Sequence, residues 1–388
     1  MIKNLLFILM ILLLGSSMQA NAQLGDKLNL KGYVQGMPLW INADLPEPYD
    51  AGSLWELRLQ NRLDLQYYIS ENWTFSWEMR TRFFTGDLVR DIPFYAESID
   101  IDQGYFNFSW LIADQDNWMM HYIPDRLYLD WTKSDWSVRI GRQRINWGIN
   151  NFTNPNDLFN IYSFYDFDYP ERPGTDAIRI QRYTGAFSRW ELAVSPGREI
   201  DNSVAALMYA FNTKGYDVQV LGGYYHDRLA IGGGWAGSIS QTGFKGEVML
   251  FSDLVEDNGN ETANIILTVS ADHMFSNSIY LLVEALYNQR GGQDTFLLIG
   301  ERLSADNPSF SRYQLTGQVN YPFSPILNGT LAAGVYPDEE AAYLSPSFTF
   351  SMLQNLDLML LAQIFAGSEE SAFANAGNII AGSITWSF

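Results

Sequence analysis

The residues that could perform acid–base or nucleophilic chemistry are few in this sequence. It contains three histidines, His121, His226 and His273, and no cysteine. His226 stands beside Asp227, and a histidine with a nearby acid or serine is the set that a membrane-embedded hydrolase would use. Neighbouring residues on a strand point to opposite faces, however, so this pair could form a dyad only within a turn. No phosphate-binding loop, HExxH helix or EF-hand loop is present. We therefore expect no enzyme activity, no cofactor and no metal site.

Arginine is the charged residue type that is unevenly distributed. Of the 18 arginines, 14 lie between residues 51 and 200, whereas the acids divide evenly, with 21 inside that span and 23 outside it. The whole chain carries a net charge of -20, which repels phosphate and excludes a nucleic-acid binder. A basic region within an acidic chain predicts a surface that guides anionic or polar solutes.

The segments that carry these arginines alternate with a period of two. Between residues 56 and 66 the odd positions are mostly leucine and the even positions are polar or charged. After the break at residues 70–72 the alternation resumes from 73 to 83, with tryptophan and phenylalanine on the apolar face. Two such runs joined by a tight turn predict a hairpin of tilted membrane strands, which need ~9 to 11 residues each. Strands of soluble sandwiches are usually ~5 to 6 residues long, so lipid is the favoured apolar partner.

The same pattern continues along the chain. It predicts eighteen strands at 28–39, 56–66, 73–83, 126–131, 135–147, 177–184, 188–196, 203–212, 216–226, 228–239, 242–252, 262–272, 277–290, 309–321, 327–336, 342–351, 356–366 and 377–388, with 99–110 as a further strand or loop structure. Short turns alternate mostly with long connections, as in outer-membrane barrels, where the short turns are periplasmic. We predict an all-β fold, a transmembrane antiparallel up-and-down barrel of 16–18 strands.

The two ends of the chain indicate export and membrane assembly. Lys3, an apolar run at residues 5–14 and the small residues Ala20 and Ala22 form a signal peptide, which predicts cleavage after residue 22 and one barrel domain over 23–388. The apolar run is shorter than the ~20 residues of a spanning helix. The chain ends at Phe388, which resembles the terminal aromatic that the barrel-assembly machinery reads. An interfacial aromatic girdle is predicted from Trp73, Trp136, Trp190 and Trp386.

If the apolar face of each strand meets lipid, the other face lines the lumen. That face carries seven arginines and four acids over the second to seventh strands: Arg58, Arg62, Arg80, Arg82, Arg139, Arg179 and Arg189 with Glu56, Asp64, Glu78 and Glu191. These arginines either guide a solute or pair with the neighbouring acids and fill the barrel.

The stretch from residue 141 to 148, GRQRINWG, breaks the alternation. Continued alternation would turn Arg142 and Arg144 toward lipid, at ~2 to 4 kcal/mol for each arginine at mid-depth. A bulge at Gly141 would instead turn both arginines and Asn146 inward, leaving Ile145 and Trp147 outside. This hypothesis adds Arg142 and Arg144 to the predicted pore lining.

Residues 126–184 resemble a Gram-negative family of porin-like barrels that is related in appearance to alginate-export and other substrate-selective porins. The resemblance is carried by Gly141, Arg142, Gln143, Trp147, Gly148, Asn154, Pro155 and Asp157. It implies an outer-membrane porin or transport role and names no substrate.

The long connection at 148–176 is a candidate constriction, because loops beyond ~12 to 15 residues are usually functional or disordered. We predict that it folds into the lumen and places these residues opposite the arginines: Asn156, Asp157, Asp166, Asp168, Glu171 and Arg172. The alternative is an exterior cap over the mouth of the barrel.

The sequence therefore predicts a passive channel for small hydrophilic solutes, anionic ones among them, in the outer membrane of a Gram-negative bacterium. Its expected partners are membrane lipid, lipopolysaccharide, the barrel-assembly machinery and periplasmic chaperones. Acidic outer loops such as 338–340 could hold divalent cations that bridge to lipopolysaccharide, or simply be solvated. The alternative function is a non-conducting barrel whose surface loops bind polysaccharide or another cell-surface partner. No residue pattern indicates an oligomeric state.

Overall fold

The computed structural model describes residues 25, 27–42, 52–102, 104–161, 165–168, 171–254, 263–291, 303–368, 371, 373 and 377–388. The predicted signal peptide lies outside these residues.

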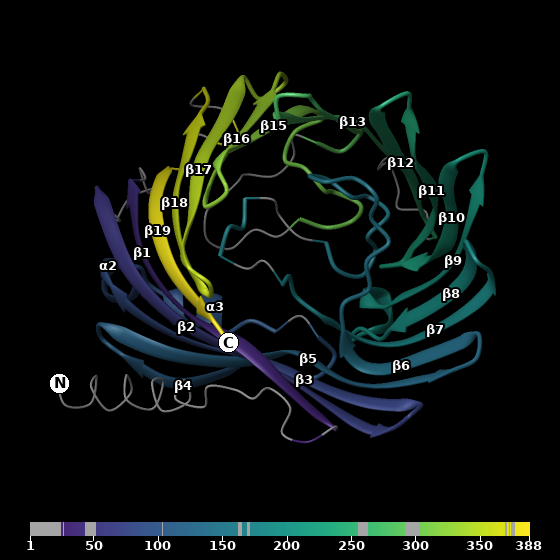
Figure 1. Cartoon of the computed structure of the whole chain (residues 1–388), viewed down its shortest axis with the longest axis horizontal. Coiled ribbons are helices and arrows are strands. Elements are labelled where there is room, and N and C mark those ends of the chain that lie inside the picture. Colours follow the sequence, from purple (N-terminus) through teal and green to yellow (C-terminus); the bar gives the residue numbers. More distant parts are fainter. Residues whose placement is uncertain are drawn as a thin grey trace.

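The described strands form one antiparallel sheet of nineteen strands, in which β4 flanks β5 and the other eighteen close into a barrel. The ring closes where β1 pairs with both β2 and β19 (Figure 1). The barrel strands are β1 (Leu28–Asn42), β2 (Ser53–Ser70), β3 (Trp73–Gly86), β5 (Trp118–Lys133), β6 (Trp136–Gln143), β7 (Thr175–Gly185), β8 (Ser188–Ser195), β9 (Val204–Thr213), β10 (Tyr216–Tyr225), β11 (Arg228–Ile239), β12 (Thr242–Asp253), β13 (Ala263–Met274), β14 (Tyr280–Asn288), β15 (Tyr313–Ser324), β16 (Leu327–Tyr336), β17 (Ala341–Leu353), β18 (Leu356–Ala366) and β19 (Asn378–Ser387). The predicted fold class is confirmed.

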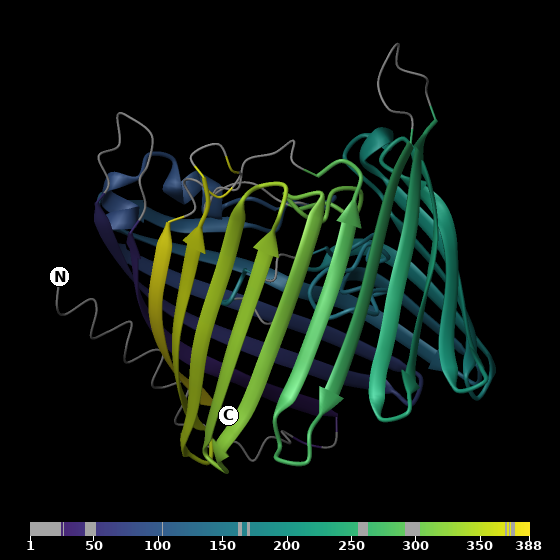
Figure 2. The same ribbon diagram turned by 90° about the horizontal axis from the view of Figure 1, so that it is seen from above.

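Four elements do not belong to the ring of strands. The chain between β3 and β5 forms α2 (Asp87–Asp91), α3 (Tyr95–Ile99) and β4 (Trp110–Gln115), and a short 3-10 turn, η1 (Ile200–Asn202), precedes β9. Short turns gather at one end of the barrel and the longer connections at the other (Figure 2). Among the described residues, no helix is long and apolar enough to cross a membrane.

The outer face of the wall is apolar, as the alternation predicts. Ile140, Ile178 and Leu192 on three consecutive strands are 51%, 48% and 41% exposed in the isolated chain. Arg139, Arg179 and Glu191 alternate with them and lie on the inner face. There Arg139 stands opposite Arg179, and Arg179 forms an ion pair with Glu191. Period-two alternation therefore separates a lipid-facing surface from a polar lumen.

Several strand boundaries differ from the prediction, and those of β5, β6 and β13 change where residues of interest lie. β5 begins at Trp118 and not near residue 126, so His121 lies on a strand and not in the preceding loop. β6 ends at Gln143 and not at residue 147, because the chain then turns into the barrel. His273 likewise lies near the end of β13, whereas a turn was predicted.

The predicted bulge at Gly141 is wrong. The pairings of β6 with β5 and β7 run through Gly141 without a register shift. The shift lies on β5, where Glu78 of β3 pairs with Arg126 and Met79 pairs with Pro124, so Asp125 is the extra residue. Gly141 has a φ of 119°, and a Cβ there would lie 2.3 Å from the Leu127 carbonyl oxygen, which explains the glycine without a bulge.

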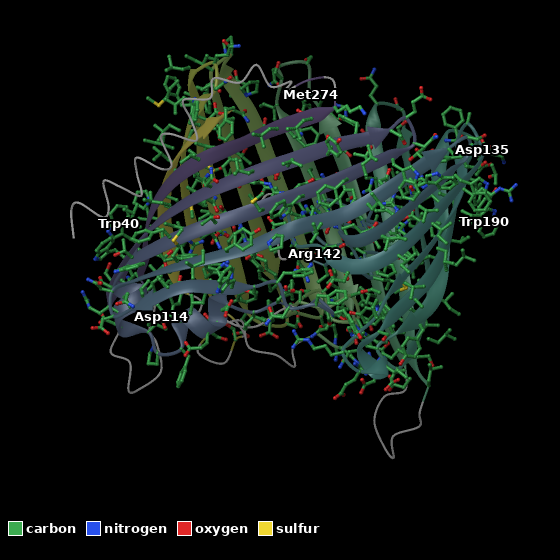
Figure 3. All side chains as sticks on the ribbon, turned by 90° about the horizontal axis from the view of Figure 1, so that it is seen from below. Trp40, Asp114, Asp135, Arg142, Trp190 and Met274 are labelled. Carbon is green, nitrogen blue, oxygen red and sulfur yellow. The ribbon has the colours of Figure 1, made fainter. Side chains whose placement is uncertain are left out.

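The C-terminus closes the seam of the barrel. The backbone N–H of Phe388 donates to Gly32 at 2.9 Å, and the N–H of Gly32 donates to Phe388 at 3.0 Å. Trp386 lies beside Phe388, with 5.2 Å between ring centroids. Trp73 and Trp136 are the first residues of their strands, and Trp190 follows the next short turn; in Figure 3 it lies at the same end of the wall as the turn residue Asp135.

Candidate functional site

The connection between β6 and β7 runs inside the barrel (Figure 1, the blue-teal trace within the ring). Its described residues contact inward-facing side chains of strands on several sides of the lumen, including Glu191 on β8, Glu247 on β12, Gln363 on β18 and Arg58 on β2. The structure therefore places the described residues of this connection, 144–161, 165–168 and 171–174, in the lumen, and not outside as an exterior cap.

The first half of this connection is held by a carboxylate on β12. Glu247 is fully buried and accepts hydrogen bonds from the backbone N–H groups of Ile149 at 2.5 Å, Asn150 at 2.7 Å and Asn156 at 2.9 Å. Asn150 also accepts a bond from Ser270 on β13 at 2.6 Å. A carboxylate that accepts several N–H bonds makes charge-assisted contacts, which are stronger than neutral ones.

A second carboxylate repeats this arrangement two strands further on. Glu284 on β14 accepts from the backbone N–H groups of Asn151 at 3.2 Å, Phe152 at 3.1 Å and Thr153 at 2.8 Å, and is 1% exposed. Sequence reasoning missed Glu247 and Glu284. For Glu284 the available signal was a lone acid at a lumen-facing position of a strand without other charges, which needs donors from elsewhere in the chain. Glu247 gave a weaker signal, because β12 also carries Lys245 and Asp253.

The expected positions of Ile145 and Trp147 are also wrong. Both side chains are buried in an interior cluster with residues such as Ala193 and Met208. The Trp147 indole N–H donates to Glu191 at 2.8 Å, and Gln219 donates to the Trp147 carbonyl at 2.5 Å. These two side chains point inward because the strand has already ended at Gln143.

The second half of the connection crosses to other parts of the wall. Tyr165 packs in an aromatic cluster with Tyr336, Tyr343 and Phe365 of β16 to β18. Asp168 pairs with Arg58, and Glu171 accepts from Tyr33 at 3.3 Å. Each of these contacts lies on the lumen side of a strand. The segment is therefore tied to the wall along most of its length.

Most of the predicted lumen arginines are neutralised by acids. Arg62, 1% exposed, meets Asp64 at 2.9 Å, Glu78 at 2.6 Å and the bulged Asp125. The remaining pairs are Arg58 with Glu56, Arg139 with Asp130, and Arg179 and Arg189 with Glu191. For these residues, pairing across the wall is the arrangement that the structure supports.

Arg82 on β3 differs from these arginines. Its guanidinium lies 3.0 Å from Nδ1 of His121 and 5.1 Å from the centre of the Phe84 ring, and no ion pair to a carboxylate is found for it among the described residues. It is 8% exposed, and Arg80 stands on the same face. Both arginines lie on the wall that Asp168 approaches.

Charges within the connection are coupled to this wall. Burial raises the pKa of Asp168, but Arg58, Arg80 and Arg82 outweigh it and hold that pKa below its usual value. Burial raises the pKa of Asp157 to about 7, against the opposing charges of Arg144 and Arg172.

The other predicted members of the connection occupy different surroundings. Asn156 is fully buried and contributes its backbone N–H to Glu247. Asp166 is exposed, and the Arg172 carbonyl accepts from Arg126 at 2.9 Å.

Arg142 does not line the lumen, contrary to the prediction. It pairs in register with Leu127 and shares the outward parity of Ile140. It is nevertheless only 3% exposed, because Asp176 at 2.9 Å and Asp102 at 2.6 Å enclose its guanidinium. Without a bulge at Gly141, the alternation keeps this side chain on the outer face.

The histidines show hydrogen-bond patterns that do not suit catalysis. Ser109 Oγ lies 2.7 Å from Nε2 of His121 and donates to Asp100 at 2.6 Å. Because the Arg82 guanidinium can only donate to Nδ1, the proton of a neutral His121 sits on Nε2, where it cannot take the proton of Ser109. His226 and Asp227 form a turn in which Asp227 accepts from Tyr224 at 2.5 Å.

The described residues hold no cluster of three or more histidine, cysteine, aspartate or glutamate side chains that could bind a metal. Asp338, in an acidic outer loop, accepts bonds from Ser311 and from the backbone N–H of Arg312 at 2.7 Å. These bonds hold the pKa of Asp338 below its usual value although burial opposes them. Asp338 therefore contributes to loop structure.

The fold and the inward connection together define a class of architecture, a wide antiparallel barrel of eighteen strands with a segment folded into its lumen. No protein-family model matches the chain, and no curated protein sequence matches it. Solved structures with a similar fold include OccAB4 of Acinetobacter baumannii, with a TM-score of 0.57, 8% identity and coverage of 95% of this chain and 100% of the other.

Two further structures are similar to this chain at the same level. A BenF-like porin of Pseudomonas fluorescens Pf-5 has a TM-score of 0.58 and 10% identity, over 93% of this chain and 98% of the other. OccK9 (OpdG) of Pseudomonas aeruginosa has a TM-score of 0.58 and 11% identity, over 93% and 97%. At such low identity these likenesses establish the fold. The family resemblance of residues 126–184 stays a prediction.

Proposed function

We propose that this protein is an outer-membrane channel through which small hydrophilic solutes diffuse passively. Barrels of 16 to 18 strands are wide enough to leave an aqueous channel unless other groups fill them. The observation that carries the proposal is the segment 144–174, which lies in the lumen and is fixed to the wall by Glu247 and Glu284. A segment that is hydrogen-bonded to the wall in this way narrows the lumen and keeps a fixed position in it. It is the proposed constriction.

Selectivity is proposed to come from Arg82 together with Arg80. Arg58, Arg62, Arg139 and Arg179 are paired with acids, so their charges are largely cancelled in the field of the lumen. Arg82 instead faces the ring nitrogen of His121. A guanidinium in a poorly solvated wall attracts anions more strongly than one in bulk water. We therefore propose a mild preference for anionic solutes, set by β3.

The test is the conductance and ion selectivity of the refolded protein in a planar bilayer. Stable open steps with an anion preference are expected for the wild type, and that preference should fall several-fold in Arg82→Ala and further when Arg80→Ala is added. Arg90→Ala is the matched control, because Arg90 is an exposed arginine on α2 that pairs with Asp87 and Asp91. Unchanged selectivity in the double variant would overturn the role of β3.

A second function is favoured by the way the lumen is packed. Tyr165 and Tyr336 lie in an aromatic cluster, and Leu158 lies in an apolar cluster with inward residues of several strands. Such packing also suits a filled barrel that displays loops to a polysaccharide or another surface partner. Well-folded protein that stays silent at all voltages would support this function, and open steps would exclude it.

The proposed location is the outer membrane of a Gram-negative bacterium, reached by export with the predicted signal peptide and by the barrel-assembly machinery with periplasmic chaperones. The apolar outer face and the closed strand ladder support a membrane location, because lipid offers no hydrogen bonds to a free sheet edge. Fractionation of expressing cells into inner and outer membranes tests it.

A further inference from the structure

A short segment of the chain lies on the outside of the barrel wall. Phe75 and Trp77 of β3 and Leu127 of β5 belong to the outward series, and Phe108 and Trp110 lie across a cavity from them. We call residues 102 and 104–110 the outer strap. Trp110 is 65% exposed and Phe106 is 57% exposed, so the strap presents aromatic rings to the surroundings of the barrel.

The polar groups of the outer strap are satisfied by buried charges. The backbone N–H of Phe106 donates to Asp176 at 2.9 Å and that of Phe108 donates to Asp102 at 2.7 Å. Arg142 donates to the Phe106 carbonyl at 2.7 Å and binds both acids. Irregular backbone at membrane depth is tolerated only where its polar groups are satisfied within the protein. In Figure 3, Arg142 lies in the middle of the wall, away from the turn residue Asp135 and from Met274 at the end of β13.

Between the strap and the wall lies an open apolar groove of about 580 Å³. It is lined by Phe75, Trp77, Asn107, Phe108, Ser109, Trp110, Tyr122, Pro124 and Leu127, none of which is an acid or a base of the Asp, Glu, Lys or Arg type. Along β3 it extends from the level of Phe75 to that of Thr81, the partner of Tyr122. Six residues span ~20 Å along the strand, or ~15 Å along the membrane normal at the usual tilt, which is about half of a hydrocarbon core of ~30 Å.

We propose that this groove binds one acyl chain of a membrane phospholipid. The groove is uncharged and faces the lipid side of the wall, which matches a hydrocarbon chain. Lipopolysaccharide carries phosphate groups that call for nearby cations, but Arg142 is already engaged by Asp102 and Asp176. The outer strap therefore acts as a clamp that holds a lipid against β3 and β5. The inference rests on the proposed membrane location and not on conduction, so a silent barrel would leave it intact.

The test uses a phosphatidylethanolamine with a photoactivatable diazirine at the end of one acyl chain, reconstituted with the full-length mature protein. After irradiation, labelled peptides are identified by mass spectrometry. Peptides covering residues 105–127 should be labelled several-fold more than lipid-facing peptides of β15 and β16. Equal labelling of lipid-facing peptides around the whole barrel of the wild-type protein would by itself overturn the proposal.

A pair of matched variants separates the groove from general lipid contact. Leu127→Trp should fill the groove and remove the excess labelling, whereas Leu331→Trp, at a 45% exposed lipid-facing position on β16, should leave it unchanged. Loss in both variants would contradict the proposal. A cross-link from the strap to a second copy of the chain, replacing the lipid label, would assign the groove to a protein contact and would also overturn it.

Discussion

The carboxylate of Glu247 on β12 accepts a hydrogen bond from the backbone N–H of Asn150 at 2.7 Å, although the two residues are 97 positions apart in the sequence. Glu284 does the same for Thr153 at 2.8 Å. Each carboxylate accepts two further N–H bonds from the same segment. Two acids on one side of the barrel thus fix a segment that begins on the opposite side.

Removing one of these carboxylates should release the lumen segment. In Glu247→Ala, the three buried N–H groups lose their acceptor, at about 1–3 kcal/mol for each group left unsatisfied. Hydrogen exchange over residues 149–156 is expected to accelerate, and single-channel current should become larger and noisier. Glu199→Ala, an exposed acid next to η1, is the control. Unchanged exchange over 149–156 would show that these bonds do not hold the segment.

The raised pKa of Asp157, which lies in the same segment, predicts that the stability of the folded protein depends on pH. Its pKa is raised to about 7 in the folded protein, mainly by burial, so the folded state binds its proton more tightly than the unfolded state does. Stability should therefore fall as the pH rises from about 4 to above 7, by at least ~1.4 kcal/mol, the value of one pKa unit. Unfolding in detergent at pH 5 and pH 8 measures this change. Asp157→Asn should make the profile shallower, and a profile as steep as that of the wild type would assign the dependence to other groups.

Arg62 should contribute to stability and Arg82 to selectivity. In Arg62→Ala, the clustered Asp64, Glu78 and Asp125 lose their common partner, and breaking a buried pair typically costs about 3–5 kcal/mol. We expect a lower midpoint of denaturant unfolding for Arg62→Ala and a near-normal midpoint for Arg82→Ala. The reverse order would mean that the pairs around Arg62 are not structural.

Phe388 should matter more for assembly in cells than for the stability of the folded barrel. Its backbone pairs with Gly32 at the seam, and this pairing does not depend on the side chain. Phe388→Ala is therefore expected to reduce the amount of protein in the outer membrane while purified, refolded protein keeps a near-normal unfolding midpoint. Pulse labelling followed by membrane fractionation measures the first quantity. Equal amounts of variant and wild type in the membrane would remove Phe388 from the predicted assembly signal.

The sequence by itself determined the strands. Period-two alternation depends only on residues i and i+2, so β2, β3 and β16 could be located before any contact was known. Turn positions follow from short polar breaks, and the number of strands follows from both. The predicted strand at 327–336 coincides with β16, Leu327–Tyr336.

Only the tertiary structure decided where the irregular residues lie. The bulge falls at Asp125 and not at Gly141. It could not be located from the sequence, because a bulge is defined by the pairing of two strands and the alternation within one strand does not reveal it. The partners of Glu247 and Glu284 could not be identified from the sequence, since they are backbone N–H groups that every residue but proline possesses. Arg142 keeps the outer face that the unbroken alternation gives it, and it is buried there because the outer strap covers it. Local periodicity thus fixes which face a side chain takes within a strand, whereas long-range contacts fix the loop, the bulge and the buried charges.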